Sequence, residues 1–130
     1  MKVTSLERYE KLSAPLYFYM MLSRRAYDKY LQNKILLHAL NIFSANEKIV
    51  QLLESQPTLI PDELLPDAIE LINHYSIWMN QFREFRQQQP FALKDIFVFH
   101  HIDNLSAFPK DAERRFLEYH QQLKNELKND

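Results

Sequence analysis

The stretch from Pro66 to Gln88 reads PDAIELINHYSIWMNQFREFRQQ, and it decides the fold. Its apolar side chains recur every three or four residues, which is the spacing of a helix and not the alternation of a strand. Together with the two preceding leucines they form a main row and a flanking row: Leu64, Ala68, Leu71, Tyr75, Trp78, Phe82 and Phe85, then Leu65, Ile69, Ile72 and Met79. So wide an apolar arc predicts a helix in the middle of a bundle, with neighbours on more than one side.

Three further stretches keep the same helical spacing. We predict an all-α, single-domain bundle over residues 1–130, with four main helices at 15–32, 34–55, 64–88 and 109–127. A short helix over residues 4–12 precedes them. Ser13 and Pro15 are expected to interrupt this helix and to start the first main helix. Residues 89–108 are the least regular part, and the apolar run that begins at Ile96 is expected to form a buried loop or a 3-10 turn.

The composition excludes several classes of enzyme. Hydrophobic residues make up 46% of the 130 and charged residues 25%, which is the balance of a soluble globular domain. The chain has no glycine, which argues against a hairpin-rich β fold and excludes the glycine-dependent nucleotide loops of Rossmann and P-loop enzymes. It also has no cysteine, and so no thiolate nucleophile, cysteine zinc site or disulfide. No cofactor is expected.

Charge is unevenly distributed along a chain whose net charge is −1. Residues 1–34 carry seven basic and three acidic side chains, residues 35–81 carry one and six, and residues 82–130 carry eight of each. The basic excess is too small to indicate a nucleic-acid partner, but the two unequal segments can attract each other inside the fold or across subunits. The longest apolar run near the N-terminus, Ala14 to Leu22, is shorter than a membrane span and does not follow a leader pattern. We therefore expect a cytoplasmic protein without a membrane partner.

The sequence His100-His101-Ile102-Asp103 places two imidazoles and a carboxylate together, and these are ligand types for zinc or iron. Adjacent residues of a regular element rarely bind one ion, and no HExxH-type pair accompanies them. Our interpretation is a loop with half-exposed histidines. A metal site at His100, His101 and Asp103 stays as the alternative.

Four residues separate Arg115 from His120, and this spacing resembles the Arg-His motif of the HEPN ribonucleases. These are small all-helical proteins in which the pair lies at a dimer cleft. The resemblance implies RNA cleavage by Arg115 and His120. Phe116 stands where the family usually has a polar residue, and residues five apart on a helix point about 140° from each other. We therefore expect Arg115 and His120 to lie on opposite sides of the apolar stripe of their helix.

Because no set of catalytic residues converges in the sequence, the favoured hypothesis is a non-enzymatic helical protein-interaction or regulatory module. Enzymatic activity stays open, with the HEPN-like ribonuclease as the first alternative. The second is a small-ligand-binding bundle with a pocket among Tyr17, Tyr75 and Trp78. Two aromatic blocks, Tyr17-Phe18-Tyr19 and Phe97-Val98-Phe99, are too crowded to be buried on one side of a helix or a loop. Exposed aromatic residues commonly anchor interfaces. A homodimer is therefore predicted, with interface residues Tyr17, Phe18, Phe97 and Phe99.

Overall fold

The structure is a computed structural model that describes residues 2–88, 90–98 and 108–129. It confirms the predicted all-α bundle. The main helices are α2 (Ala14–Gln32), α3 (Leu36–Ser55), α4 (Leu65–Gln87) and α5 (Lys110–Lys128). Short elements join them: α1 (Ser5–Arg8) and the π-turn η1 (Tyr9–Ser13) before α2, then the 3-10 turns η2 (Pro57–Leu59) and η3 (Asp62–Leu64) between α3 and α4.

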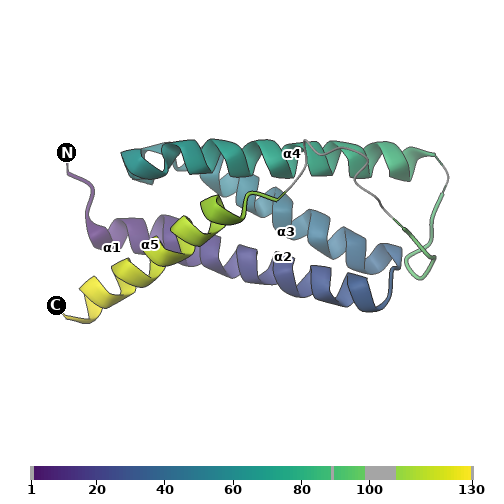
Figure 1. Cartoon of the computed structure of the whole chain (residues 1–130), viewed down its shortest axis with the longest axis horizontal. Helices are drawn as coiled ribbons and strands as arrows, with labels where there is room; N and C mark the ends of the chain where they lie inside the picture. The colour runs from purple at the N-terminus through teal and green to yellow at the C-terminus, as the bar shows by residue number, and fades with distance from the viewer. Residues whose placement is uncertain (1, 89, 99–107, 130) are drawn as a thin grey trace.

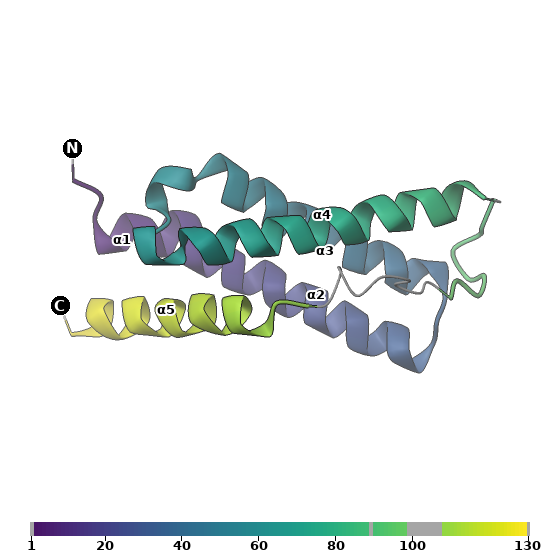
Figure 2. The ribbon, with the colours of Figure 1, turned by 45° about the horizontal axis from the view of Figure 1, so that its top comes forward.

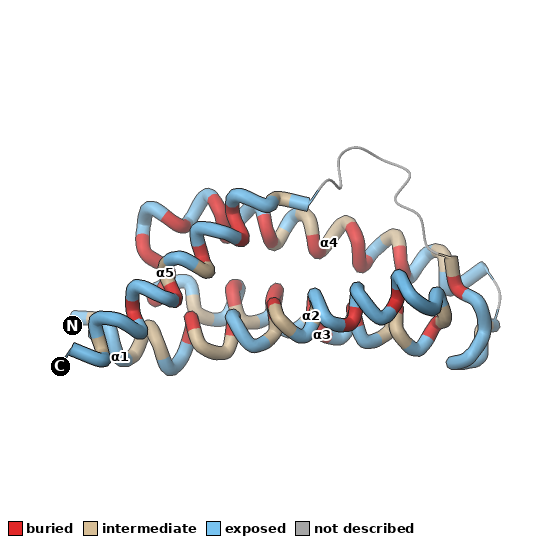
Figure 3. The backbone as a smooth tube through the Cα atoms, turned by 60° about the horizontal axis from the view of Figure 1, so that its bottom comes forward, coloured by how far each residue is buried: buried red, intermediate tan, exposed pale blue. Residues whose placement is uncertain are grey.

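The helices form two layers, which Figure 3 shows edge-on. The first layer is the hairpin of α2 and α3, and the second contains α4 and α5. In Figure 1 the helix α5 runs obliquely back toward the start of the chain, so α1, the first turns of α2 and the end of α5 share one end of the bundle. Figure 2 shows that α5 lies beside only the first half of α2. Among the described helices, none covers the side of α2 that faces away from α4 and α5.

The position of α4 agrees only in part with its sequence pattern, which predicted a helix in the middle of the bundle. Its main apolar row is buried between the two layers from Leu64 to Phe82, and Phe85 is partly buried. Trp78 stacks on Phe82 with ring centroids 5.5 Å apart. Phe43 of α3 packs against both rings. The flanking row is less buried than the pattern predicts, since Ile69 is 59% exposed. The reason is that α4 lies at one side of the bundle and not at its centre.

The predicted interruption at Ser13 and Pro15 is wrong, because α1, η1 and α2 form one continuous helix. The backbone N–H of Ala14 donates to the carbonyl of Tyr9, five residues back, which is the hydrogen bond of a π-turn. In a regular α-helix the ring of Pro15 would clash with the carbonyl of Lys11. The wider π-turn gives that carbonyl room, so the helix continues through the proline.

The segment before α5 is a loop, as predicted, but the prediction that it is buried holds for only one of its described residues, Phe97, since Ile96 is 75% exposed. It caps α3, because the backbone N–H groups of Leu36 and Leu37 donate to the carbonyls of Asp95 (3.0 Å) and Leu93 (2.9 Å). These are first-turn donors that have no partner inside a helix, and no side chain caps α3. A single antiparallel bridge joins Ile35 to Ile96. The loop therefore supplies the hydrogen-bond acceptors at the N-terminus of α3 that a capping side chain would otherwise supply.

Candidate functional site

The most unusual polar arrangement in the described chain surrounds His120 of α5. Its ring lies between the rings of Tyr9 and Tyr17, with centroids 5.6 and 4.6 Å away and planes tilted by 9° and 12°. The hydroxyl of Ser13 lies 2.9 Å from its Nδ1. Ser13 and His120 are both buried. Burial, and next the positive charge of Lys124, lower the pKa of His120, so the site favours the neutral imidazole.

The π-turn is what brings Tyr9 and Tyr17 to the same ring. Eight residues of an α-helix turn through about 800°, which leaves positions 9 and 17 about 80° apart. A π-turn takes in one residue more than an α-turn, and this extra residue removes most of the difference. Tyr9 and Tyr17 therefore stand on one line of the helix, with Ser13 between them and His120 inserted from α5.

Arg115 points to another helix. Its guanidinium donates to Oδ1 of Asp67 at 2.8 Å, so it attaches α5 to the first turn of α4. His120 attaches the same helix to η1. The two residues of the HEPN-like motif are thus held by opposite neighbours of α5, on the two sides of its apolar stripe. The structure does not bring them together within one chain.

A second ion pair lies between α2 and α5, where Arg24 binds the buried carboxylate of Glu113. Burial raises the pKa of Glu113, while the nearby Arg24 works in the opposite direction. The neighbouring Tyr75 of α4 also has a raised pKa, first because it is buried and next because Glu113 is close. These groups stabilise the junction of three helices, and burial is the main cause of the raised pKa of both Glu113 and Tyr75.

A serine hydroxyl bonded to an imidazole is a possible nucleophile and base. Here the pair lies inside the helix packing, with aromatic rings on both faces of the histidine. A substrate needs access to the nucleophile and a group that stabilises the developing charge. Both Ser13 and His120 are buried, so the packing of the described helices leaves a substrate no access to the pair, and their contact links η1 to α5.

The alternative metal ligands His100, His101 and Asp103 lie outside the described residues, as does Phe99. Within the described ranges, no group of three histidine, aspartate or glutamate side chains is placed to hold a metal ion.

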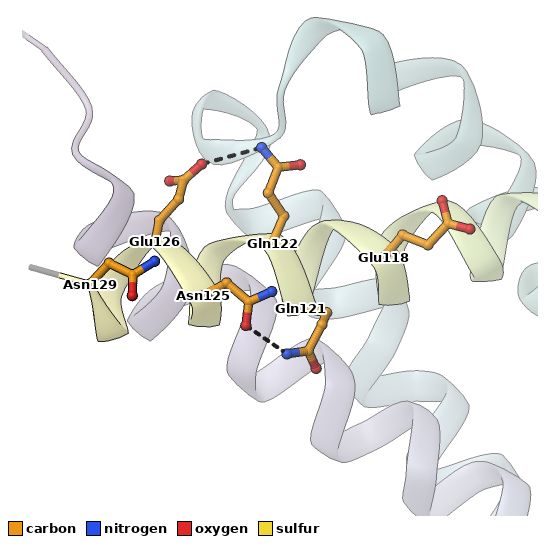
Figure 4. Close-up of a pocket in the computed structure, with 6 residues that line it drawn as sticks. All are labelled: Glu118, Gln121, Gln122, Asn125, Glu126 and Asn129. Atoms are coloured by element: carbon orange, nitrogen blue, oxygen red, sulfur yellow. Dashed lines mark hydrogen bonds between the residues drawn. The ribbon is translucent and has the colours of Figure 1, made fainter.

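In the described part of the chain, the three aromatic residues of the predicted ligand pocket make separate contacts. Tyr17 stacks on His120, Trp78 stacks on Phe82, and Tyr75 is buried in the core. A shallow hollow of about 470 Å³ follows the polar face of α5. Figure 4 shows its side chains partly engaged with one another, Gln121 with Asn125 and Gln122 with Glu126. The hollow is lined by Glu118, Gln121, Gln122, Asn125, Glu126 and Asn129.

A second hollow, of about 360 Å³, lies where α1, η3 and α5 meet. Arg8, Glu63 and Tyr119 are among the side chains that line it. Burial raises the pKa of Tyr119, and Arg8 opposes this shift. None of Tyr17, Tyr75 and Trp78 lines either hollow.

The proposed interface residues differ in exposure. Phe97 is fully buried (0% exposed), in contact with the rings of Phe82, Phe85 and Phe91, and offers no surface to another chain. The physical reason is that the capping loop turns this side chain into the core. Phe18 is 56% exposed, and Tyr17 is exposed on the side that His120 does not cover.

Sequence reasoning missed Leu22, which is 42% exposed one turn after Phe18. The spacing of four residues between two large apolar side chains was the available signal. It also missed Tyr9 and Ser13, for which the only signal was the pair of tyrosines eight residues apart, close to a proline.

The chain matches no protein-family model, no curated protein and no solved structure. None of the described helices has the length and apolar character of a membrane span.

Proposed function

We propose that this protein is a non-enzymatic helical interaction module that binds its partner through the outward side of α2. The observation that carries the proposal is the exposure of Phe18 and Leu22, which lie one helical turn apart on a side of α2 that no other described helix covers. Large apolar side chains that share an exposed helix face are typical of binding sites for another helix. Arg25 and Lys29 continue the same face toward the end of α2 and are exposed.

We call Phe18, Leu22, Arg25 and Lys29 the α2 stripe. Their spacings of four, three and four residues keep them on one side of an α-helix. The stripe has an apolar half and a basic half. Aromatic and apolar anchors supply most of the binding free energy in protein interfaces, and charges at the edge contribute mainly to orientation.

The positions of the candidate catalytic residues support a non-enzymatic role. His120 is enclosed by Tyr9, Tyr17 and Ser13, and Arg115 is bound to Asp67. A general base must reach the proton that it removes, and these contacts hold both side chains against their own chain. The proposal therefore needs no reaction at this site.

A nuclease assay tests the proposal against the ribonuclease alternative. Purified protein is incubated with structured RNA, beside His120→Ala, Arg115→Ala and the control His38→Ala, with circular dichroism as a check of folding. We expect no cleavage above a buffer blank for any of the four proteins. Cleavage that is lost in folded His120→Ala and Arg115→Ala but kept in His38→Ala would overturn the proposal.

A thermal-shift screen with small molecules tests the ligand-binding alternative. A ligand that binds only the folded state stabilises it by RT ln(1 + L/Kd), where L is the ligand concentration, so the unfolding temperature rises with that concentration. We expect that no small molecule raises the unfolding temperature of the wild type with increasing ligand concentration while leaving that of Tyr17→Ala unchanged. Such a rise would favour a ligand-binding bundle in place of an interaction module.

A further inference from the structure

We infer that the α2 stripe binds a second copy of this chain, with the two α2 helices antiparallel about a two-fold axis. This inference rests on the proposed function and names its partner. The observation that carries it is the order of charged residues along the outward side of the continuous helix formed by α1, η1 and α2. The π-turn determines that order.

The π-turn adds an acidic residue to the line of the α2 stripe. Tyr9 and Tyr17, eight residues apart, both stack on the ring of His120, which fixes the offset across the π-turn at eight residues. The same offset relates Glu10 to Phe18. In an uninterrupted α-helix the offset would be seven, and Lys11 would stand on this line instead. The π-turn therefore replaces a base with an acid at the beginning of the stripe.

The extended stripe has an acid at one end, apolar residues in the middle and bases at the other end. Glu10, Arg25 and Lys29 are exposed. Within the described residues, none of the three has an ion-pair partner. With a rise of 1.5 Å per residue, Lys29 lies about 16 Å beyond Phe18 along the helix axis. The two charged ends are thus well separated from each other and free to meet another chain.

This order is complementary to itself when the second helix runs in the opposite direction. In a two-fold dimer, if residue i contacts residue j of the partner, then j contacts i. We place Phe18 opposite Leu22 of the partner subunit. Because of the π-turn, Glu10 stands where a residue seven positions before Phe18 would stand in a regular α-helix, and Lys29 is seven positions after Leu22. Glu10 therefore lies opposite Lys29 of the partner subunit, and the symmetry repeats both contacts. A parallel pair would place Glu10 against Glu10 and Lys29 against Lys29. The charges therefore favour the antiparallel dimer and disfavour the parallel one.

Sedimentation equilibrium from low micromolar to sub-millimolar concentration tests for the dimer. The chain has a mass of 15.7 kDa, and we expect the apparent mass to rise toward twice that value with concentration. A contact along one helix is at the small end of interfaces, so micromolar or weaker affinity is expected. Phe18→Glu should raise the dissociation constant at least about tenfold, since it places a charge at the apolar centre.

The matched control is Ile69→Glu, because Ile69 of α4 is 59% exposed and Phe18 is 56% exposed. The control should dimerise like the wild type. Circular dichroism and thermal unfolding establish that both variants are folded.

Charge reversal tests the register. Glu10→Lys should raise the dissociation constant by roughly three- to thirtyfold, because two symmetry-related pairs become repulsive together. The double variant Glu10→Lys/Lys29→Glu restores opposite charges in the antiparallel register and should return to within about threefold of the wild type. Glu84→Lys, an exposed acid of α4, is the control and should have no effect.

Three results would overturn the inference. A constant mass of 15.7 kDa over the whole range excludes a second copy as partner, while the nuclease assay still decides the non-enzymatic role. A dimer that Ile69→Glu breaks and Phe18→Glu does not uses another surface. A dimer that Glu10→Lys leaves unchanged, or that the double variant fails to restore, has another register.

Discussion

Ser13 and His120 are 107 positions apart in the chain, yet the Ser13 hydroxyl lies 2.9 Å from Nδ1 of His120. This bond joins the π-turn to the last helix at the point where two tyrosine rings enclose the imidazole. It fixes the position of α5 along α2, because a shift by one residue would move the imidazole out of the space between the rings.

Replacing His120 with alanine should lower the free energy of unfolding by about 2 to 4 kcal/mol. The variant loses two ring contacts, leaves a cavity and removes a partner from the buried Ser13 hydroxyl. Urea unfolding followed by circular dichroism measures the loss. The control is Gln121→Ala, at the next, exposed position of α5, for which a change within about 0.5 kcal/mol is expected. Equal losses in both variants would contradict the packing role of His120.

The stability contributed by His120 should fall as the solution is acidified. Its pKa in the folded chain is lowered from the usual 6.5, so the unfolded chain takes up a proton first. The contribution is therefore complete above about pH 6.5 and is lost as the pH falls through the lower folded value. The groups around the ring are Tyr9, Ser13 and Tyr17 from η1 and α2, and Lys124 from α5.

The measurement compares wild type with His120→Gln at about pH 7.5 and about pH 5.5. The wild type should lose more stability than the variant between the two conditions. Glu113, whose raised pKa gives the opposite trend, is present in both proteins and cancels in the difference. An equal loss in the two proteins would show that His120 does not titrate as predicted.

Replacing Arg24 with methionine should destabilise the fold by about 1 to 3 kcal/mol at neutral pH. The variant leaves the buried carboxylate of Glu113 without its cationic partner. Because the pKa of Glu113 is already raised, this cost should shrink as the pH falls through its folded value and the carboxyl becomes neutral. Urea unfolding at about pH 7 and about pH 5 measures the difference. Arg86→Met, at an exposed arginine of α4, is the control and should show no such recovery in acid.

Two adjacent residues of the capping loop should respond very differently to truncation. Phe97 is fully buried, and its carbonyl accepts a 2.7 Å hydrogen bond from the Tyr30 hydroxyl, whereas Ile96 is 75% exposed. Phe97→Ala should cost about 3 to 5 kcal/mol and Ile96→Ala no more than about 0.5 kcal/mol. Chemical denaturation of both variants measures these values. Similar losses would mean that the loop does not place Phe97 in the core.

Local periodicity was sufficient to predict the four main helices, whose ends agree with the structure within two residues. The apolar rows of α4 predicted the burial of Trp78 correctly, because the side-chain spacing determines which face is apolar. The same rows did not show that Ile69 is exposed, since they contain no information on how far the neighbouring helices extend.

The surroundings of His120 and the position of Phe97 could not be predicted for a different reason. The contact between Ser13 and His120 depends on the angle at which α5 crosses α2, and no short-range pattern contains that angle. In the run that begins at Ile96, four apolar residues follow one another without alternation, so the sequence does not indicate which side chain points inward. The continuous helix through Pro15 required a π-turn, which is rare enough that a break was the natural expectation.

The hydroxyl of Ser5 donates to Glu126 at 3.2 Å, so the first and last helices of the chain meet. Counted with this contact, the helices form a closed ring in which each touches the next: α1 continues into α2, α2 packs on α3, α3 on α4, α4 on α5, and α5 on α1. The contact between α5 and α1, where the two chain ends lie, is then one of several contacts between neighbouring helices in that ring. A circular permutant that links the two ends and opens between α4 and α5 would keep every helix beside its present neighbours, with α5 and α1 turned into a consecutive antiparallel hairpin.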